Sequence, residues 1–212
     1  MAEFSKTAQY KDWPDLPPLV ARSVEIAEGF GFIHCCLPNH GLLLQVLVRG
    51  RAGGIIGEAG TGCGTGLAWM VSAVGPNTKF VSVELDPARA AACQALFADC
   101  PNVTVLRGDW RQIEAYAPFD LMVLDGGGGG KRENDPPGEP ARLLKPGGTV
   151  VLDDYHPPLE YWPEPADSRD RFGRSSTTAR QHWLLHPDLF VTEVRVHPRI
   201  SSILGTLKVA RP

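Results

Sequence analysis

Short apolar runs alternate with helical segments over most of the chain. The runs of strand length lie at 54–57, 80–83, 103–106, 121–124 and 149–152. Near-continuous apolar runs of this length are typical of strands buried on both faces of a parallel sheet. Helical patterns lie between them, at 66–74, 87–98, 110–117 and 139–144. This alternation predicts an α/β fold with a doubly wound, mostly parallel sheet.

Both ends of the chain depart from this rhythm. Residues 16–50 have the pattern of two helices, and Asn39 is a candidate cap for the second. Near the other end, Leu189–Val196 and Ser202–Val209 alternate polar and apolar positions across a short link. This pattern predicts an antiparallel hairpin that completes the sheet.

Length and composition indicate a globular protein. The chain has 212 residues, of which 43% are hydrophobic, enough for one domain with a substantial core. We therefore expect a single domain over 1–212, with an N-terminal helical cap at 1–50 and a core at 51–212. The five cysteines are odd in number and form no C-x-x-C pair, which favours reduced structural thiols.

Charge and hydropathy exclude several partners. The net charge of -3 gives no general attraction to polyanions, and we find no local basic patch, so no nucleic-acid partner is expected. The apolar run at 41–48 is too short for a membrane span. The first twenty residues mix charges and prolines without the apolar core of a signal peptide. These observations predict a cytoplasmic protein with no membrane partner.

A glycine-rich turn between a predicted buried strand and a helix is the most informative segment. It reads Glu58-Ala59-Gly60-Thr61-Gly62-Cys63-Gly64. Such a turn presents backbone amides to a ligand at the carboxyl end of the strand, and glycine permits the tight torsions. The dinucleotide fingerprint G-x-G-x-x-G is absent, because its third position is Thr65 when counted from Gly60 and Leu67 when counted from Gly62.

The spacing Glu58-x-Gly60-x-Gly62-x-Gly64 resembles the first motif of the class I S-adenosylmethionine-dependent methyltransferases. The resemblance implies that the cofactor S-adenosyl-L-methionine binds at the turn, through Glu58, Ala59, Gly60, Thr61, Gly62 and Gly64, with the acid near its methionine part. The next strand ends in Glu84-Leu85-Asp86-Pro87. We assign the ribose hydroxyls to Glu84, with Leu85 beside it. Asp86 is expected to cap the following helix, with Pro87 at its first position.

Two further segments extend the resemblance over about residues 41–154. Arg107-Gly108-Asp109-Trp110 is similar to the segment where an acid meets the adenine amino group and an apolar side chain covers the ring. Taken alone, Asp109 is better explained as a helix cap and Trp110 as a core residue, but their order after the glycine turn favours cofactor binding. The Pro-Gly-Gly turn at 146–148 looks like the family's entry to its fifth strand, so a Rossmann-like sheet is implied.

Acidic residues follow the fourth and fifth predicted strands, at the edge where open α/β sheets bind ligands. They are Asp125 and the pair Asp153-Asp154, the latter followed by Tyr155-His156. The arrangement is similar to the catechol O-methyltransferase-like branch. This similarity implies that Asp125 contacts the cofactor and that Asp125, Asp153 and Asp154 bind Mg²⁺ or Ca²⁺, which orients an acceptor hydroxyl.

The chain departs from that branch at two places. Asp154 replaces an Asn, and glycines follow Asp125. Without a metal, Asp154 or His156 is the candidate general base, because a hydroxyl nucleophile must lose its proton. The catalytic candidates are therefore Asp125, Asp154 and His156. The structural alternative is a strand end, a turn cap and an exposed loop residue.

The expected function is methyl transfer from S-adenosylmethionine to a small-molecule acceptor, at a hydroxyl oxygen. The alternatives are an aminopropyltransferase-like enzyme and a non-catalytic protein that binds S-adenosylmethionine. Methyl transfer from a sulfonium depends mainly on positioning and on exclusion of water. The glycine-rich stretch at 126–140 is either a surface loop or a lid over the acceptor. A homodimer is expected by analogy with the family.

Overall fold

The computed structural model describes residues 4–132, 134–155 and 173–209, with only the backbone of 173–177. Its helices are η1 (Thr7–Tyr10), α1 (Pro18–Gly29), α2 (Pro38–Arg49), α3 (Thr65–Val71), α4 (Pro87–Leu96), η2 (Trp110–Tyr116), α5 (Pro140–Leu143) and α6 (Gly173–Leu184). Its strands are β1 (Ile55–Ala59), β2 (Lys79–Glu84), β3 (Val103–Arg107), β4 (Phe119–Leu124), β5 (Leu144–Tyr155), β6 (Leu189–His197) and β7 (Ile200–Leu207). Within these ranges, no helix has the length and apolar character needed to cross a membrane.

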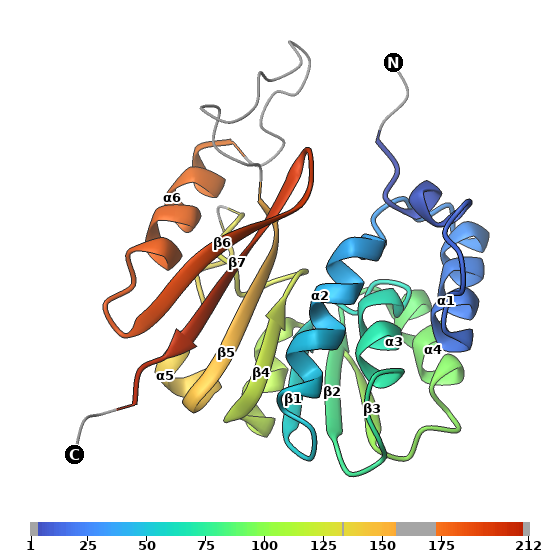
Figure 1. The fold of residues 1–212 in the computed structure, drawn as a ribbon, viewed down its shortest axis with the longest axis horizontal. Coiled ribbons are helices and arrows are strands. Elements are labelled where there is room, and N and C mark those ends of the chain that lie inside the picture. The colour runs from blue at the N-terminus through green and yellow to red at the C-terminus, as the bar shows by residue number, and fades with distance from the viewer. Residues whose placement is uncertain (1–3, 133, 156–172, 210–212) are drawn as a thin grey trace.

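The seven strands form one sheet in the order β3-β2-β1-β4-β5-β7-β6 (Figure 1). The first five are parallel, whereas β7 is antiparallel to β5 and to β6. The predicted Rossmann-like, mostly parallel sheet with an antiparallel hairpin is therefore confirmed. Residues His197 and Ile200 already pair, so β7 begins at Ile200 rather than at Ser202.

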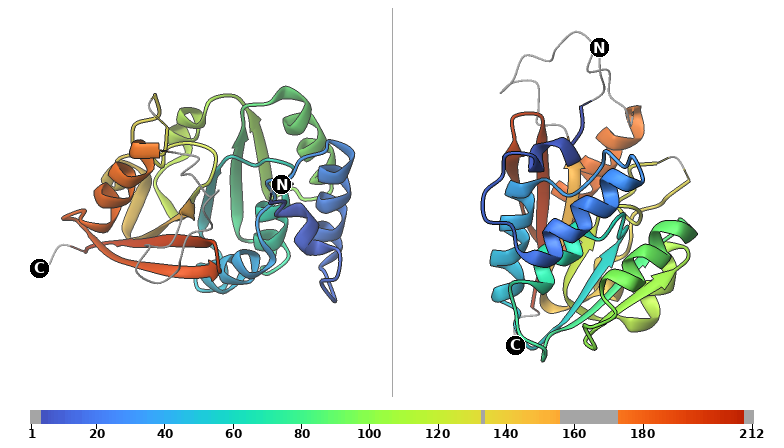
Figure 2. Two further views of the ribbon diagram at one scale, coloured as in Figure 1. Left: turned by 90° about the horizontal axis from the view of Figure 1, so that it is seen from above. Right: turned by 90° about the vertical axis from the view of Figure 1, so that its right-hand side faces the viewer.

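Helices cover both faces of the sheet, as expected of a doubly wound fold (Figure 2). On one face, α1 to α4 pack on alternate strand residues such as Ile56 and Phe80. On the other face, η2, α5 and α6 cover the intervening positions, including Met122 and Leu152. Because successive strand side chains point to opposite faces, one apolar run supplies both cores.

Most helix starts follow the sequence rules. Asp86 precedes α4 and accepts hydrogen bonds from the amides of Ala88 and Arg89, so the predicted cap is confirmed. The cap predicted at Asn39 is wrong, because α2 begins one residue earlier at Pro38. Proline is favoured at a first helical position, where its missing N–H leaves no bond unmade.

The third crossover and the helix before β6 differ from the sequence prediction. The segment predicted as a helix at 110–117 is the 3₁₀ helix η2. Helix α6 was not predicted, because its sequence is polar and lacks a continuous apolar stripe. Ala179 and Trp183, one turn apart, are buried on it and pack in the second core. Tertiary packing therefore compensates for a weak local signal.

Candidate cofactor and acceptor site

The glycine turn after β1 has the torsions that the sequence requires. Gly60, Gly62 and Gly64 have φ values of 97°, 56° and 89°, in the region that favours glycine. A Cβ atom at Gly60 would lie 2.3 Å from the amide nitrogen of Gly126, which follows β4. The amides of Gly60 and Thr61 donate to the carbonyl of Val83, at 2.9 and 3.2 Å. The turn is therefore fixed against the carboxyl ends of both neighbouring strands.

Glu58 is a buried carboxyl group at the end of β1. Its Oε2 accepts a hydrogen bond of 2.6 Å from Ser82 Oγ, which also lies 2.6 Å from Thr61 Oγ1. Burial, followed by the negative charges of Asp125 and Glu84, raises the pKa of Glu58 to about 8 despite the bond from Ser82. Among the described residues, no cation forms an ion pair with it. A carboxyl in this environment suits a ligand that carries a positive charge.

Glu84 connects the glycine turn to α4. Its Oε2 accepts a hydrogen bond of 2.8 Å from the amide of Gly62. Its Oε1 accepts from the amide of Asp86 at 2.9 Å and from Arg89 Nη2 at 2.8 Å. Arg89 also lies over the ring of Phe32, 5.2 Å from its centroid. The ribose role predicted for Glu84 fits best at Oε2, because Oε1 already has three donors.

The segment after β3 presents Trp110 to the loop after β4. Its ring lies against Gly127 and Gly128, where added Cβ atoms would meet ring carbons at 2.5 and 3.0 Å. Trp110 Nε1 is buried and is the one buried side-chain polar atom without a hydrogen-bond partner in the described part of the chain. Buried indole N–H groups usually have a partner, so an acceptor from a ligand would complete this site.

Asp109 and Leu85 have weaker support from their surroundings. Asp109 caps η2 by accepting from the amide of Arg111 at 3.0 Å, and it also pairs with the side chain of Arg111. The alternative of a helix cap is thus realised, and a further contact with adenine stays a prediction. Leu85 is 69% exposed beyond the end of β2, so its side chain is accessible to a ligand.

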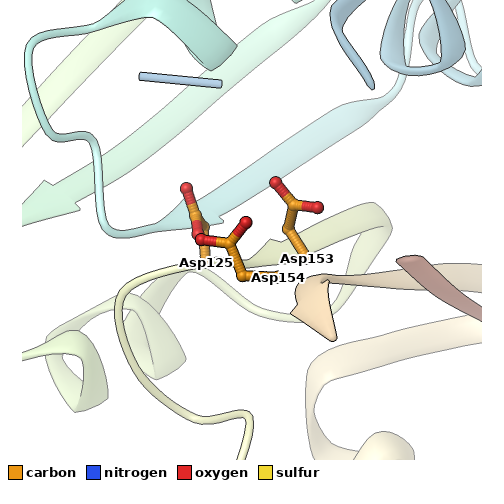
Figure 3. Close-up of side chains that lie close together, drawn as sticks. All are labelled: Asp125, Asp153 and Asp154. Carbon is orange, nitrogen blue, oxygen red and sulfur yellow. The ribbon is translucent and has the colours of Figure 1, made fainter. Parts of the chain in front are cut away.

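Three carboxylates gather at the ends of β4 and β5. Ligand atoms of Asp125, Asp153 and Asp154 lie within 4.8 Å of one another, and the three side chains extend toward the same side (Figure 3). Consecutive strand residues normally point to opposite faces. Here the pairing of β5 with β7 shifts between Leu152 and Tyr155, and Asp154 has a φ of 60°. This bulge brings both neighbouring acids into one cluster.

Lysines surround this acidic cluster. Lys6 Nζ donates to both carboxylate oxygens of Asp154, at 2.9 and 2.8 Å, and Lys131 Nζ donates to the carbonyl of Asp153. Burial opposes the charged form of Lys6, but Asp154, Asp125 and Asp153 outweigh it and raise the pKa of Lys6. Burial and the carboxylates Asp154 and Asp153 likewise raise the pKa of Asp125, against the effect of Lys6.

Asp153 is held on its other side by α2 and β7. Its Oδ1 accepts from Ser202 Oγ at 2.9 Å and lies 3.2 Å from His40 Nδ1. Burial lowers the pKa of His40 despite the nearby carboxylate. The pKa of Asp153 is lowered by His40, Lys6 and Lys131, which overcome its burial. Asp153 is therefore an ionised side chain held in place by its hydrogen-bond and charge partners.

The loop after β4 is tied to α6. The carbonyl of Gly129 accepts hydrogen bonds from Trp183 Nε1 at 2.9 Å and from the hydroxyl of Tyr155 at 3.4 Å. The amide of Gly138 donates to the carbonyl of Gly128 at 2.7 Å. These bonds anchor the loop beside the acidic cluster. A role for this loop as a lid over the acceptor stays a prediction.

The predicted site residues that the structure describes lie along one edge of the sheet, at the carboxyl ends of β1 to β5. His156, the remaining catalytic candidate, lies outside the described residues. Sequence reasoning missed Lys6, Ser82 and Arg89. Arg89 carried a local signal, since it follows Glu84 by five positions near the start of a helix. Lys6 carried none, because 148 positions separate it from Asp154.

Comparison with known proteins finds similarity to methyltransferases. Residues 58–155 match the family model of a methyltransferase domain. A relative from Mycobacterium avium, provisionally named an O-methyltransferase, is 28% identical over 138 residues, which cover 62% of this chain and 59% of the relative. A relative from Mycobacterium tuberculosis, also provisionally named an O-methyltransferase, is 26% identical over 122 residues, or 54% of each chain. The predicted resemblance to the class I methyltransferases is confirmed.

Solved structures share this methyltransferase fold over nearly the whole chain. The O-methyltransferase of tomaymycin synthesis from Streptomyces achromogenes, in complex with S-adenosylmethionine, has a TM-score of 0.72 at 18% identity and covers 99% of this chain and 100% of its own. An O-methyltransferase from Bacillus cereus, in complex with S-adenosylhomocysteine, has a TM-score of 0.71 at 16% identity, with coverage of 97% and 98%. By contrast, this chain matches only 59% of the length of the first curated relative.

The two groups that the methyltransferase resemblance implies fit this site differently. S-adenosylmethionine fits the buried carboxyl of Glu58, the glycine turn and the unpartnered Trp110 Nε1. For a divalent ion the three carboxylates have suitable oxygen ligands. However, Lys6 occupies both oxygens of Asp154. In this arrangement the residues present do not fit an ion.

Proposed function

We propose that the chain binds S-adenosylmethionine and transfers its methyl group to a hydroxyl oxygen of a small molecule. The observation that carries this proposal is the buried Glu58 carboxyl, without a cationic partner in the described structure, beneath a turn of three left-handed glycines. S-adenosylmethionine supplies an ammonium for that carboxyl and an activated methyl group. The names of the relatives and the cofactors in the two solved structures support the same activity.

The residues of the chain divide the work along the sheet edge. Glu58 and the glycine turn hold the amino-acid part, Glu84 the ribose, and Trp110 the adenine. Asp125 belongs to the acidic cluster and directly precedes Gly126, whose backbone contacts Gly60 in the cofactor turn. Of the candidate bases, Asp154 is paired with Lys6. We therefore favour Asp125 for contact with the acceptor hydroxyl, with acceleration mainly from positioning and exclusion of water. The homodimer and the cytoplasmic location stay predictions.

Calorimetry with S-adenosylhomocysteine tests the cofactor assignment. Glu84→Gln removes charge-assisted hydrogen bonds of ~1.5–3 kcal/mol, so the dissociation constant is expected to rise about 10- to 100-fold. Glu25→Gln on the exposed side of α1 is the matched control and is expected to bind like the wild type. Equal binding by Glu84→Gln and the wild type would remove the ribose assignment.

An acceptor screen separates the enzyme from a binding protein. Phenols, hydroxy acids and amines are incubated with methyl-labelled S-adenosylmethionine, and transfer of the label is measured. We expect transfer to at least one hydroxyl compound. Binding of the cofactor without transfer to any class would favour the non-catalytic alternative, and transfer only to amines would contradict the oxygen acceptor.

A further inference from the structure

Lys6 is a buried cation beside the three carboxylates of the acidic cluster. Its side chain is 5% exposed, and its Nζ lies 2.9 and 2.8 Å from the two carboxylate oxygens of Asp154. This two-oxygen contact places the ammonium at the cluster formed with Asp125 and Asp153. A buried charge of this kind is costly unless it is paired, so the position of the lysine and that of the acids depend on each other.

The N-terminal segment holds Lys6 in this position through its backbone. The amide of Lys6 donates to the carbonyl of Ile33 at 2.8 Å, and Thr7 Oγ1 donates to the carbonyl of Phe32 at 2.5 Å. A few residues on, the hydroxyl of Tyr10 donates to the carbonyl of Cys36 at 2.5 Å. The lysine therefore enters the site from an anchored segment rather than as a free surface side chain.

The negative charge of Asp154 explains why a cation lies beside it. Asp153 has Ser202, His40 and the nearby Lys131 as partners. Among the described residues, the hydrogen bonds that the Asp154 carboxylate accepts come from Lys6. Asp154 is also the residue at which the sequence departs from the Asp-Asn pair of the similar branch. An Asn at this position would remove the carboxylate that accepts both hydrogen bonds from Lys6, whereas Asp154 and Lys6 form an ion pair.

We propose that the ammonium of Lys6 takes the place of a divalent ion at the acceptor end of the site. The role given to Lys6 in this inference rests on the proposed methyl transfer. The Mn²⁺ titration that tests it does not require that activity. Lys6 is a positioning residue: it holds Asp154 and provides the positive charge beside which an acceptor hydroxyl is oriented. A divalent ion and Lys6 compete for the same carboxylate oxygens, so the wild-type protein transfers methyl groups without added metal.

Titration with Mn²⁺ tests the proposal without any cofactor or acceptor. Binding is measured by calorimetry and by the loss of the free-ion signal in electron paramagnetic resonance. The wild type is expected to bind no Mn²⁺ at the cluster. Lys6→Met keeps the length of the side chain but frees the three carboxylates. It is expected to bind one ion with a dissociation constant of ~10⁻⁴–10⁻³ M, as in weak calcium sites. Lys11→Met, an exposed lysine in the same segment, is the control and should behave as the wild type.

Three outcomes would overturn the proposal. The first is binding of Mn²⁺ by the wild type that Asp154→Asn abolishes. The second is a folded Lys6→Met and a folded Lys6→Ala, judged by thermal melting, that both bind no more Mn²⁺ than the wild type. The third is wild-type methyl transfer that a chelator abolishes and Mg²⁺ restores. The wild-type titration is decisive even where neither variant folds, and a failed acceptor screen leaves it unaffected.

Discussion

Glu58 shows how much a single residue can depend on its surroundings. The sequence predicted an acid at the end of the first strand, and this placement is confirmed. Its proton affinity was not predictable, because it arises from burial and from Asp125 and Glu84, which come from other strands. Ser82, the donor to Glu58, was also not predicted, since a serine within an apolar run has no distinct pattern.

Binding of S-adenosylhomocysteine is expected to be pH-dependent through Glu58. With a pKa of about 8 the free carboxyl is largely protonated at pH 7, whereas a bound ammonium favours the ionised form. Binding should therefore release a proton, and the affinity should rise by up to about tenfold per pH unit between pH 6 and 8. Calorimetry in buffers with different ionisation enthalpies measures the released proton.

The variant Glu58→Gln separates proton release by Glu58 from proton release by Asp125. This variant should bind S-adenosylhomocysteine more weakly than the wild type and release fewer protons on binding between about pH 6 and 8. The free energy of unfolding depends on pH in the opposite direction. Between pH 4.5, the ordinary pKa of a Glu carboxyl, and about pH 8, the folded chain retains a proton on Glu58 that the unfolded chain has lost. The contribution of Glu58 to stability therefore falls as the pH rises through this range. Equal proton release by the variant and the wild type would contradict the assignment.

The strands and the connections after them position the site. The alternating apolar runs were sufficient to predict the parallel strands, because each run is buried on both faces. The bulge at Asp153 and Asp154 was not predictable from the local sequence. It depends on the register in which β5 pairs with β7, a strand that is distant in the sequence. The ion pair of Lys6 is a similar case, because it joins two distant elements.

The crossing of Gly60 and Gly126 is expected to be intolerant of any side chain. Gly60→Ala adds a Cβ atom 2.3 Å from a backbone nitrogen at a φ of 97°, so it combines torsional strain with overlap. The free energy of unfolding should fall by about 2–4 kcal/mol, and binding of S-adenosylhomocysteine should be lost or strongly weakened. Chemical denaturation and calorimetry measure the two effects.

Gly75→Ala is the matched control, because nothing lies within 4 Å of its added Cβ atom. Its stability should change by less than about 0.5 kcal/mol, as is usual for surface substitutions. A Gly60→Ala protein that is as stable as Gly75→Ala and retains full affinity would show that the crossing is free to relax.

At the scale of the whole molecule, α6 connects the second core to the acceptor end. Trp183 is fully buried and also donates to Gly129 in the loop after β4. The amino-acid pattern of α6 did not predict a helix, whereas the doubly wound, mostly parallel sheet and the terminal hairpin were predicted. The difference is physical: α6 is stabilised by two buried side chains and by its contacts, not by an apolar stripe.

Truncation of Trp183 should affect both the core and the loop. Trp183→Ala is expected to lower the free energy of unfolding by about 3–5 kcal/mol, measured by denaturant titration. It also removes a donor to Gly129, so a wider range of acceptors or a higher KM for the acceptor should accompany the loss. Leu185→Ala, at a side chain that is 79% exposed two residues along, is the control. Similar stabilities of the two variants would show that α6 contributes little to the fold.

The direct contact between the backbones of Gly60 and Gly126 has a consequence for changing the acceptor by mutagenesis. One glycine belongs to the turn expected to hold the cofactor, and the other begins the loop beside the acidic cluster. No side chain separates them to absorb a displacement, so remodelling of the second loop will alter the first. Libraries that seek new acceptors should therefore keep both glycines and vary the exposed positions farther along the loop.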